Sequence, residues 1–189
     1  SLYPRDICPL IKSTLGLGLG KICPYLPTID MAVGETTCDG KKKAWEILGT
    51  MIPMYVMEVP QKKGKIDREL WLQEVKLFKE KVEELSGRKV TLNNLKRCMR
   101  IVNRKRQALG RLNELRKLPL LPISGKDALL VAQVSLIDDP ERLTDHVEVL
   151  CRELERRVKK DVRTFKMGTK RIMVSGCPMV VPNWKIHNI

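Results

Sequence analysis

Three long amphipathic segments constrain the fold of this chain more than any other feature of its sequence. In residues 67–85 the apolar side chains recur at spacings of four and three, and a Ser-Gly pair closes the segment. That period is typical of a helix with one buried face. Residues 91–118 and 140–158 show the same period, with Thr91 as the expected N-cap of one and Pro140 at the first helical position of the other. The sequence therefore predicts three long helices.

Short apolar runs before and after these helices are typical of buried strands. Residues 29–37 and 54–59 are such runs, and a helix-compatible stretch, 40–48, lies between them. Residues 171–174 form a third run, and a final helix is expected from Asn183. Strands that alternate with helices predict an α/β fold, with a helix-rich layer on a small parallel sheet of Rossmann-like or flavodoxin-like type.

The helical segments also set the expected domain organisation. We expect residues 1–170 to form an N-terminal α/β domain with a helical insertion at about 65–160, and residues 171–189 to begin the next βα unit. The sequence opens without Met and stops inside that unit, so a fragment of a larger two-domain chain is expected. No signal peptide and no apolar run of roughly 18 residues is present, which predicts a cytoplasmic protein with no membrane partner.

The cysteines form the most informative pattern for function. Cys8, Cys23 and Cys38 are spaced fifteen residues apart, and Cys8, Cys23 and Cys177 are each followed by proline. Proline moves the preceding residue out of the helical region, so these thiols are expected on extended or turning backbone. Cys38 ends the first predicted strand and Cys177 the third, and open α/β sheets bind ligands at the carboxyl ends of their strands. Thiolates gathered there would suit a metal cluster.

Other uses of the cysteines stay open at this point. Zinc is the rival metal, although the chain has no C-x-x-C pair. A cysteine nucleophile assisted by His146 or His187 is another alternative. Free cysteine is also among the most buried residue types, and we expect Cys98 and Cys151, which border apolar helical faces, to be core residues.

Residues 14–20 alternate glycine with other residues and superficially resemble a dinucleotide-binding loop. The run does not match G-x-G-x-x-G and does not follow a predicted strand. We therefore expect a flexible turn near the thiol site.

The chain carries a large excess of positive charge. The chain has 36 Lys+Arg against 22 Asp+Glu, a formal net charge of +14. Nine basic residues lie between positions 96 and 117, but aromatic residues are only 4% and no groove-reading motif is present, so nucleic acid is not an expected partner. Lys41, Lys42 and Lys43 add positive charge beside Cys38.

Arg106 differs from the other basic residues because it continues an apolar helical series. A buried arginine must be paired, so we expect either a salt bridge to a neighbouring element or an anchor for an anionic substrate or for the thiol-bearing domain. The expected inner face of this helix consists of Leu92, Leu95, Met99, Val102 and Leu109.

Several of these runs resemble the signatures of one known family. Residues 8–13 and 35–43 resemble the two N-terminal signatures of the 2-hydroxyacyl-CoA dehydratase and benzoyl-CoA reductase family, in its D-component. Cys8, Cys23 and Cys38 together are most similar to the double-cubane-cluster reductases, because the middle Cys-Pro is not general to the dehydratases. Further family motifs are resembled, in order, by residues 55–60, 103–106, 124–125 and 174–178.

The resemblance implies a cofactor and its ligands. It implies that residues 1–170 bind an iron–sulfur cluster, either one 4Fe-4S cubane or two cubanes bridged by sulfide. Cys8 and Cys38 match the family's cluster ligands, Cys23 matches the extra cysteine of the double-cubane group, and Cys177 is a further candidate. No catalytic residue is assigned.

The resemblance also implies partners and an activity. An oxygen-sensitive component of this kind takes low-potential electrons from a separate ATP-hydrolysing iron–sulfur activator, and ATP acts only through that activator. A homologous subunit or a second copy is expected, with acyl-CoA as a candidate substrate. A double-cubane-type reductase is the favoured function, and a 2-hydroxyacyl-CoA dehydratase subunit is the alternative. A non-enzymatic cluster-carrying or interaction module is the alternative of another class. Family chains continue further, so the fragment alone is expected to be inactive.

Overall fold

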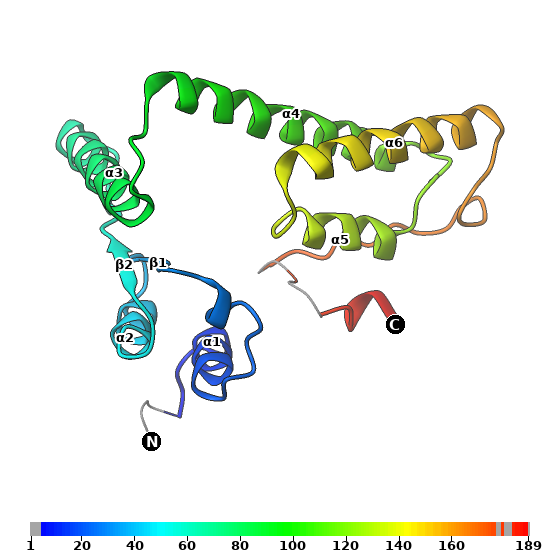
Figure 1. The fold of residues 1–189 in the computed structure, drawn as a ribbon. Coiled ribbons are helices and arrows are strands. Elements are labelled where there is room, and N and C mark those ends of the chain that lie inside the picture. Colours follow the sequence, from blue (N-terminus) through cyan, green and yellow to red (C-terminus); the bar gives the residue numbers. More distant parts are fainter. Residues whose placement is uncertain (1–4, 177–178, 180–182, 189) are drawn as a thin grey trace. The chain divides into compact units, whose positions relative to one another are not determined.

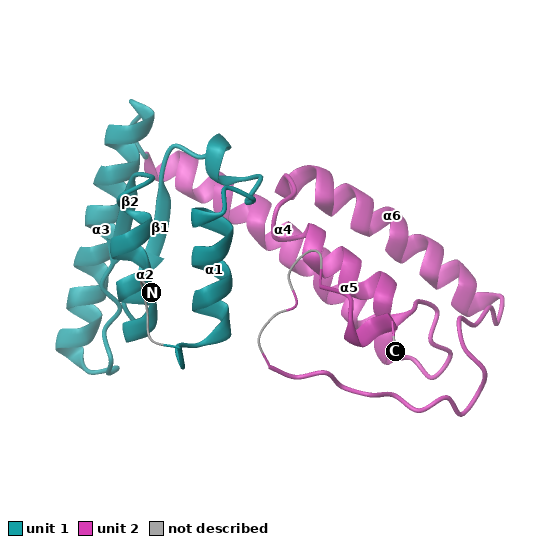
Figure 2. Ribbon diagram, turned by 90° about the horizontal axis from the view of Figure 1, so that it is seen from below, with its two compact units in different colours: residues 1–90 teal, residues 91–189 magenta. Residues whose placement is uncertain are grey.

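The computed structural model describes residues 5–176, 179 and 183–188 of the chain. The chain divides into two compact units, residues 1–90 and residues 91–189 (Figure 2). Each unit has a hydrophobic cluster of its own. The domain boundary expected at residue 170 stays a prediction.

The first unit is built around a β-α-β arrangement. Strand β1 (Ala32–Glu35) and strand β2 (Met54–Met57) are parallel, with Ala32 opposite Met54 and Glu35 opposite Met57. Helix α2 (Asp39–Leu48) connects them. The predicted α/β class with a small parallel sheet is confirmed, although both strands are shorter than the apolar runs that predicted them.

Helices cover both faces of this sheet. Successive residues of a strand point to opposite faces. Met54 packs against the cluster formed by α1 and α2, whereas the ring of Tyr55 lies 5.4 Å from that of Phe78, measured between centroids. Phe78 belongs to helix α3 (Lys65–Ser86), which Gly87 ends in the left-handed conformation as predicted. The Tyr55 hydroxyl also donates to Glu74 Oε1 of α3 at 3.1 Å.

Helix α1 (Pro9–Leu19) was not expected from the sequence, and the turn predicted over residues 14–20 is wrong. Leu15 is the second residue of that run and is fully buried. Its side chain packs against Ala44 and Leu48 of α2, so burial at the α1–α2 interface outweighs the weak helix propensity of the glycines. A short 3-10 helix (Leu26–Thr28) then leads to β1.

The second unit consists mainly of helices, as the long amphipathic periods predicted. Helices α4 (Leu92–Lys117) and α6 (Pro140–Lys159) lie side by side, and α5 (Gly125–Val134) connects them (Figure 1). No helix in the described part of the chain is both long and apolar enough to cross a bilayer. The buried cluster of this unit comprises Ala108, Leu112, Leu115, Ile123, Ala128, Leu143, Val147, Cys151 and Leu154.

The first half of α4 differs from the prediction. Its expected inner face is exposed, with Leu92 at 65% and Met99 at 62% of full accessibility. The core of the unit instead contacts Ala108, Leu112 and Leu115, which lie on another side of the helix and further along it. Only Leu109 of the expected face packs against that core. One helix thus carries two apolar faces, and simple periodicity cannot tell which of them is covered.

Arg106 and Cys98 lie on the uncovered part of α4. Arg106 is exposed and donates to Asn103 Oδ1 at 3.3 Å, so the prediction that it is buried was wrong. The core position expected for Cys98 was also wrong, because this cysteine is exposed. Both predictions assumed that the face containing Met99 packs against the protein interior.

The C-terminal segment also departs from the predicted order of elements. Residues 171–174 have no regular structure, and Ile172 and Met173 are each 87% exposed. A strand is stable only when its backbone groups find partners, and the described residues of this segment pair with no strand. In place of the helix expected from Asn183, the structure has a 3-10 turn at Ile186–Asn188.

Candidate functional site

Two predicted ligand residues occupy the same structural position in two helices. Cys8 is the N-cap of α1, with φ −45° and ψ 131°, and Cys38 is the N-cap of α2, with φ −146° and ψ 130°. Both thiols are exposed. The extended or turning, non-helical backbone predicted for Cys8 from the following proline is therefore confirmed, as is the strand-to-helix position predicted for Cys38.

A glycine in the first turn of α2 lets the two helix starts approach closely. A Cβ atom at Gly40 would lie only 3.3 Å from Ile11 Cγ1 and 3.7 Å from Ile7 Cδ1, which belong to the start of α1 and the residues before it. The same Cβ would lie 3.7 Å from Cys38 Sγ. The N-terminal turns of α1 and α2 are thus in contact beside the Cys38 thiol.

The other ends of these helices are also close together. A Cβ atom at Gly18, near the end of α1, would lie 2.7 Å from Leu48 Cδ2, at the end of α2. The N-terminal turns of α1 and α2 therefore contact each other, and so do their C-terminal turns. The two helices thus run parallel, in the same direction. This arrangement brings Cys8 and Cys38 to one end of the α1–α2 pair.

The N-caps of these two helices differ from those of the other unit. Thr91, Ser124 and Asp139 cap α4, α5 and α6, and each accepts a hydrogen bond from a backbone N–H of the first turn. Cys8 and Cys38 make no such side-chain bond. A Ser, Thr, Asp or Asn cap stabilises a helix by about 0.5–2 kcal/mol relative to alanine. The two cysteines therefore give up helix stability at the end of the α1–α2 pair where both helices begin.

The turn between β1 and α2 is closed by a carboxylate that the sequence analysis did not single out. Glu35 Oε2 accepts from the backbone N–H of Thr37 at 2.7 Å, and Glu35 Oε1 forms an ion pair with Lys41 Nζ. The hydrogen bonds from Lys41 and from Thr37 lower the pKa of Glu35 to about 2. The available signal was the spacing, with an acid three residues before Cys38 and a lysine three residues after it.

Lys41 also responds to the charge of Cys38. The hydrogen bond to Glu35 is the main cause that raises the pKa of Lys41, and the negative charge of a Cys38 thiolate acts in the same direction. The positive charge expected beside Cys38 is therefore present. The partial positive charge at the start of α2 adds to it.

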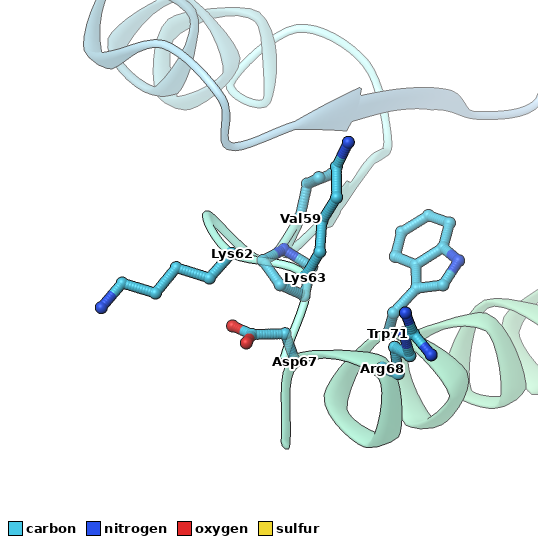
Figure 3. Close-up of a pocket in the computed structure, with 7 residues that line it drawn as sticks. Val59, Lys62, Lys63, Asp67, Arg68 and Trp71 are labelled. Carbon is cyan, nitrogen blue, oxygen red and sulfur yellow. The ribbon is translucent and has the colours of Figure 1, made fainter. Parts of the chain in front are cut away.

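The carboxyl ends of the two strands are linked and open onto a shallow pocket. Thr36 Oγ1 accepts from the backbone N–H of Val59 at 3.1 Å, which joins the segment after β1 to the segment after β2. Beyond β2 lies an open pocket of about 280 Å³, between the strand and the start of α3 (Figure 3). Its walls combine apolar and charged side chains: Val59, Pro60, Lys62, Lys63, Asp67, Arg68 and Trp71.

The structure does not bring Cys23 to this site. The backbone N–H of Cys23 donates to Leu17 O at 3.3 Å, so Cys23 lies at the C-terminal end of α1. Cys8 lies at the opposite end, and a helix of this length, residues 9–19, spans about 16 Å. Cys177 lies outside the described residues.

Cys151 is buried in the second unit, as predicted, and desolvation raises the pKa of its thiol. Within the described residues no group of three or more His, Cys, Asp or Glu side chains is placed to hold a metal ion. Cys8 and Cys38 have the side-chain type that binds soft metals and iron–sulfur clusters, and they lie at the same end of the α1–α2 pair.

The fold and this thiol pair define a class: an α/β domain with two exposed N-cap cysteines at one end of a pair of parallel helices. The chain belongs to the 2-hydroxyglutaryl-CoA dehydratase D-component family, whose sequence model matches residues 1–189. The family expected from the motifs is thereby confirmed, and it is a family of enzyme components.

Two curated relatives are similar to this chain over part of their own length. It is 34% identical over 178 residues to the putative dehydratase subunit YjiM of Escherichia coli K12. It is 26% identical over 180 residues to one of the subunits of the benzoyl-CoA reductase of Thauera aromatica. Each match covers 93% of this chain but only 46% and 45% of the relatives. The chain thus spans about half the length of the curated relatives it matches.

Proposed function

We propose that the chain is the N-terminal part of an iron–sulfur reductase or dehydratase component in which Cys8 and Cys38 bind the cluster. The observation that carries the proposal is the parallel packing of α1 and α2, which places two uncapped, exposed N-cap thiols at one end. Cys8 and Cys38 would act as ligands, and Lys41 would offset part of their negative charge. When bound, the cluster would supply one-electron reduction at low potential.

The partners follow from the incomplete ligand set. Two thiols cannot complete the coordination of a cubane. We infer that the remaining ligands come from a part of the protein that corresponds to the unmatched half of the relatives, or from a homologous subunit. The electron would come from an ATP-hydrolysing iron–sulfur activator, and an acyl-CoA is the proposed substrate class. The positive charge around Cys38 would favour an anionic cluster and an acidic partner.

Anaerobic reconstitution of the complete protein with iron and sulfide tests the cluster. We expect a charge-transfer absorption and bound iron, both lost when Cys8 and Cys38 are replaced by serine. Cys98→Ser is the matched control, because Cys98 is an exposed thiol on α4 in the other unit. An unchanged absorption in the Cys8→Ser/Cys38→Ser variant would refute the proposal.

A dehydratase subunit with a single cubane is the second candidate function, favoured by two observations. One curated relative is a putative dehydratase subunit, and Cys23 lies at the far end of α1 from the thiol pair. Iron analysis of Cys23→Ser separates the candidates. A double-cubane reductase would lose part of its iron, whereas a single-cubane dehydratase would keep all of it.

A further inference from the structure

Helix α2 begins with an unfavourable charge pattern. Lys41, Lys42 and Lys43 lie in its first turns, although the N-terminal end of a helix carries partial positive charge and is stabilised by acids. The structure gives each lysine a carboxylate. Lys42 pairs with Asp39 at 3.3 Å and Lys43 pairs with Glu46, both within α2. Lys41 alone pairs with a residue outside the helix, Glu35 of β1.

The pair formed by Glu35 and Lys41 encloses the turn that carries Cys38. One oxygen of Glu35 accepts from Thr37, the residue before Cys38, and the other binds Lys41, in the first turn after it. The two side chains are 30% and 39% exposed, against 60% and 64% for Lys43 and its partner. Charges that are less exposed are screened less by water and salt, so this pair acts more strongly on its surroundings.

We propose that Glu35 and Lys41 form a charge-neutral clamp that fixes the β1–α2 turn and sets the electrostatic potential at the Cys38 sulfur. Both are positioning residues. Lys41 raises the electrostatic potential at Cys38, and Glu35 limits this effect while it holds the lysine in place. The inference rests on the proposed function only in taking Cys38 as a ligand. Removal of either charge must therefore shift the potential at the sulfur, and the two shifts must have opposite signs.

Thiol labelling with reagents of opposite charge measures that potential directly. The full-length protein, prepared without iron, is treated with an anionic and a cationic methanethiosulfonate, and modification of Cys38 is followed by peptide mass spectrometry. Glu35→Gln can still accept from Thr37, and it should raise the ratio of anionic to cationic rates by about three- to tenfold at low salt. Lys41→Met should lower the ratio by a similar factor, and the double variant should return close to the wild-type value.

Lys43→Met is the matched control, because it removes an equal charge whose pair lies within α2. Its ratio should change by less than about twofold. The clamp is refuted if Lys41→Met behaves like Lys43→Met, or if Glu35→Gln and Lys41→Met shift the ratio in the same direction. Should circular dichroism show that Lys41→Met is unfolded, Lys41→Arg must keep the wild-type ratio and Glu35→Gln alone must raise it. No iron is present in this assay, so failure of the clamp is distinguishable from failure of cluster binding.

Discussion

Serine at the two N-cap positions is expected to make the iron-free protein more stable than alanine at the same positions. The backbone at Cys8 and Cys38 is already extended, with ψ near 130° at both positions, so a serine hydroxyl could accept a first-turn N–H without rearrangement. One such cap contributes about 0.5–2 kcal/mol relative to alanine. The double variant should therefore gain about 1–3 kcal/mol over the double alanine variant, allowing for incomplete additivity between neighbouring sites. For a unit the size of residues 1–90, each 1 kcal/mol raises Tm by roughly 4–8 °C.

Urea unfolding followed by far-UV circular dichroism, in the presence of a reductant, measures this gain. The comparison is between Cys8→Ser/Cys38→Ser and Cys8→Ala/Cys38→Ala, because both pairs remove the thiols and only serine restores the caps. Cys98→Ser, in the second turn of α4 and away from its cap, should change the free energy of unfolding by less than about 0.5 kcal/mol. If the double serine variant is no more stable than the double alanine variant, the first-turn N–H groups need no side-chain cap. That result would refute the predicted capping effect.

Three further changes test other parts of the structure. The pKa of Glu35 is about 2 instead of 4.5, so its stabilising effect is present above pH 4.5 and is lost as the pH falls toward 2. In Glu35→Gln, the free energy of unfolding in urea should therefore depend less on pH between 4.5 and 2. An unchanged pH profile would contradict this role of Glu35. Asp139→Ala removes the acceptor of two N–H groups of α6 and should cost about 1 kcal/mol in thermal unfolding, whereas no change would mean that the cap is dispensable. Arg106→Met should change the free energy of unfolding by less than about 0.5 kcal/mol, because Arg106 is exposed. Lost activity at unchanged stability would support the role of Arg106 as an anchor for an anionic substrate. Unchanged activity would reject that role.

Where start and stop signals are local, the sequence predicted the elements well. Gly87, Thr91 and Pro140 mark helix ends that the structure reproduces within two residues. The N-cap at Cys38 was also predictable, because an apolar run and a helix-compatible run meet there. Such signals depend on backbone groups of the same segment, so no knowledge of the tertiary structure is needed to read them.

Features that depend on distant partners could not be read in this way. The glycines of residues 14–20 predicted a turn, and only the burial of Leu15 against α2 makes that run helical. Residues 171–174 have the composition of a strand but pair with no strand in the described chain. The pairing of Glu35 with Lys41 likewise needs the strand and the helix to be placed first. In each case the deciding contact joins segments whose proximity the sequence pattern does not specify.

Three departures from local rules occur together at one end of the α1–α2 pair. Cys8 and Cys38 leave first-turn N–H groups without a side-chain cap, and Lys41 places positive charge where a helix start already carries it. Helices α4, α5 and α6 begin with side chains that accept such bonds, whereas α3 begins at Gly64, which has no side chain. An anionic cluster bound by both thiols would accept hydrogen bonds from the uncapped N–H groups and would be stabilised by the charge of Lys41. Hydrogen bonds to sulfur and net charge both set the reduction potential of such a cluster. The lost helix stability and the proposed binding chemistry therefore have the same structural cause.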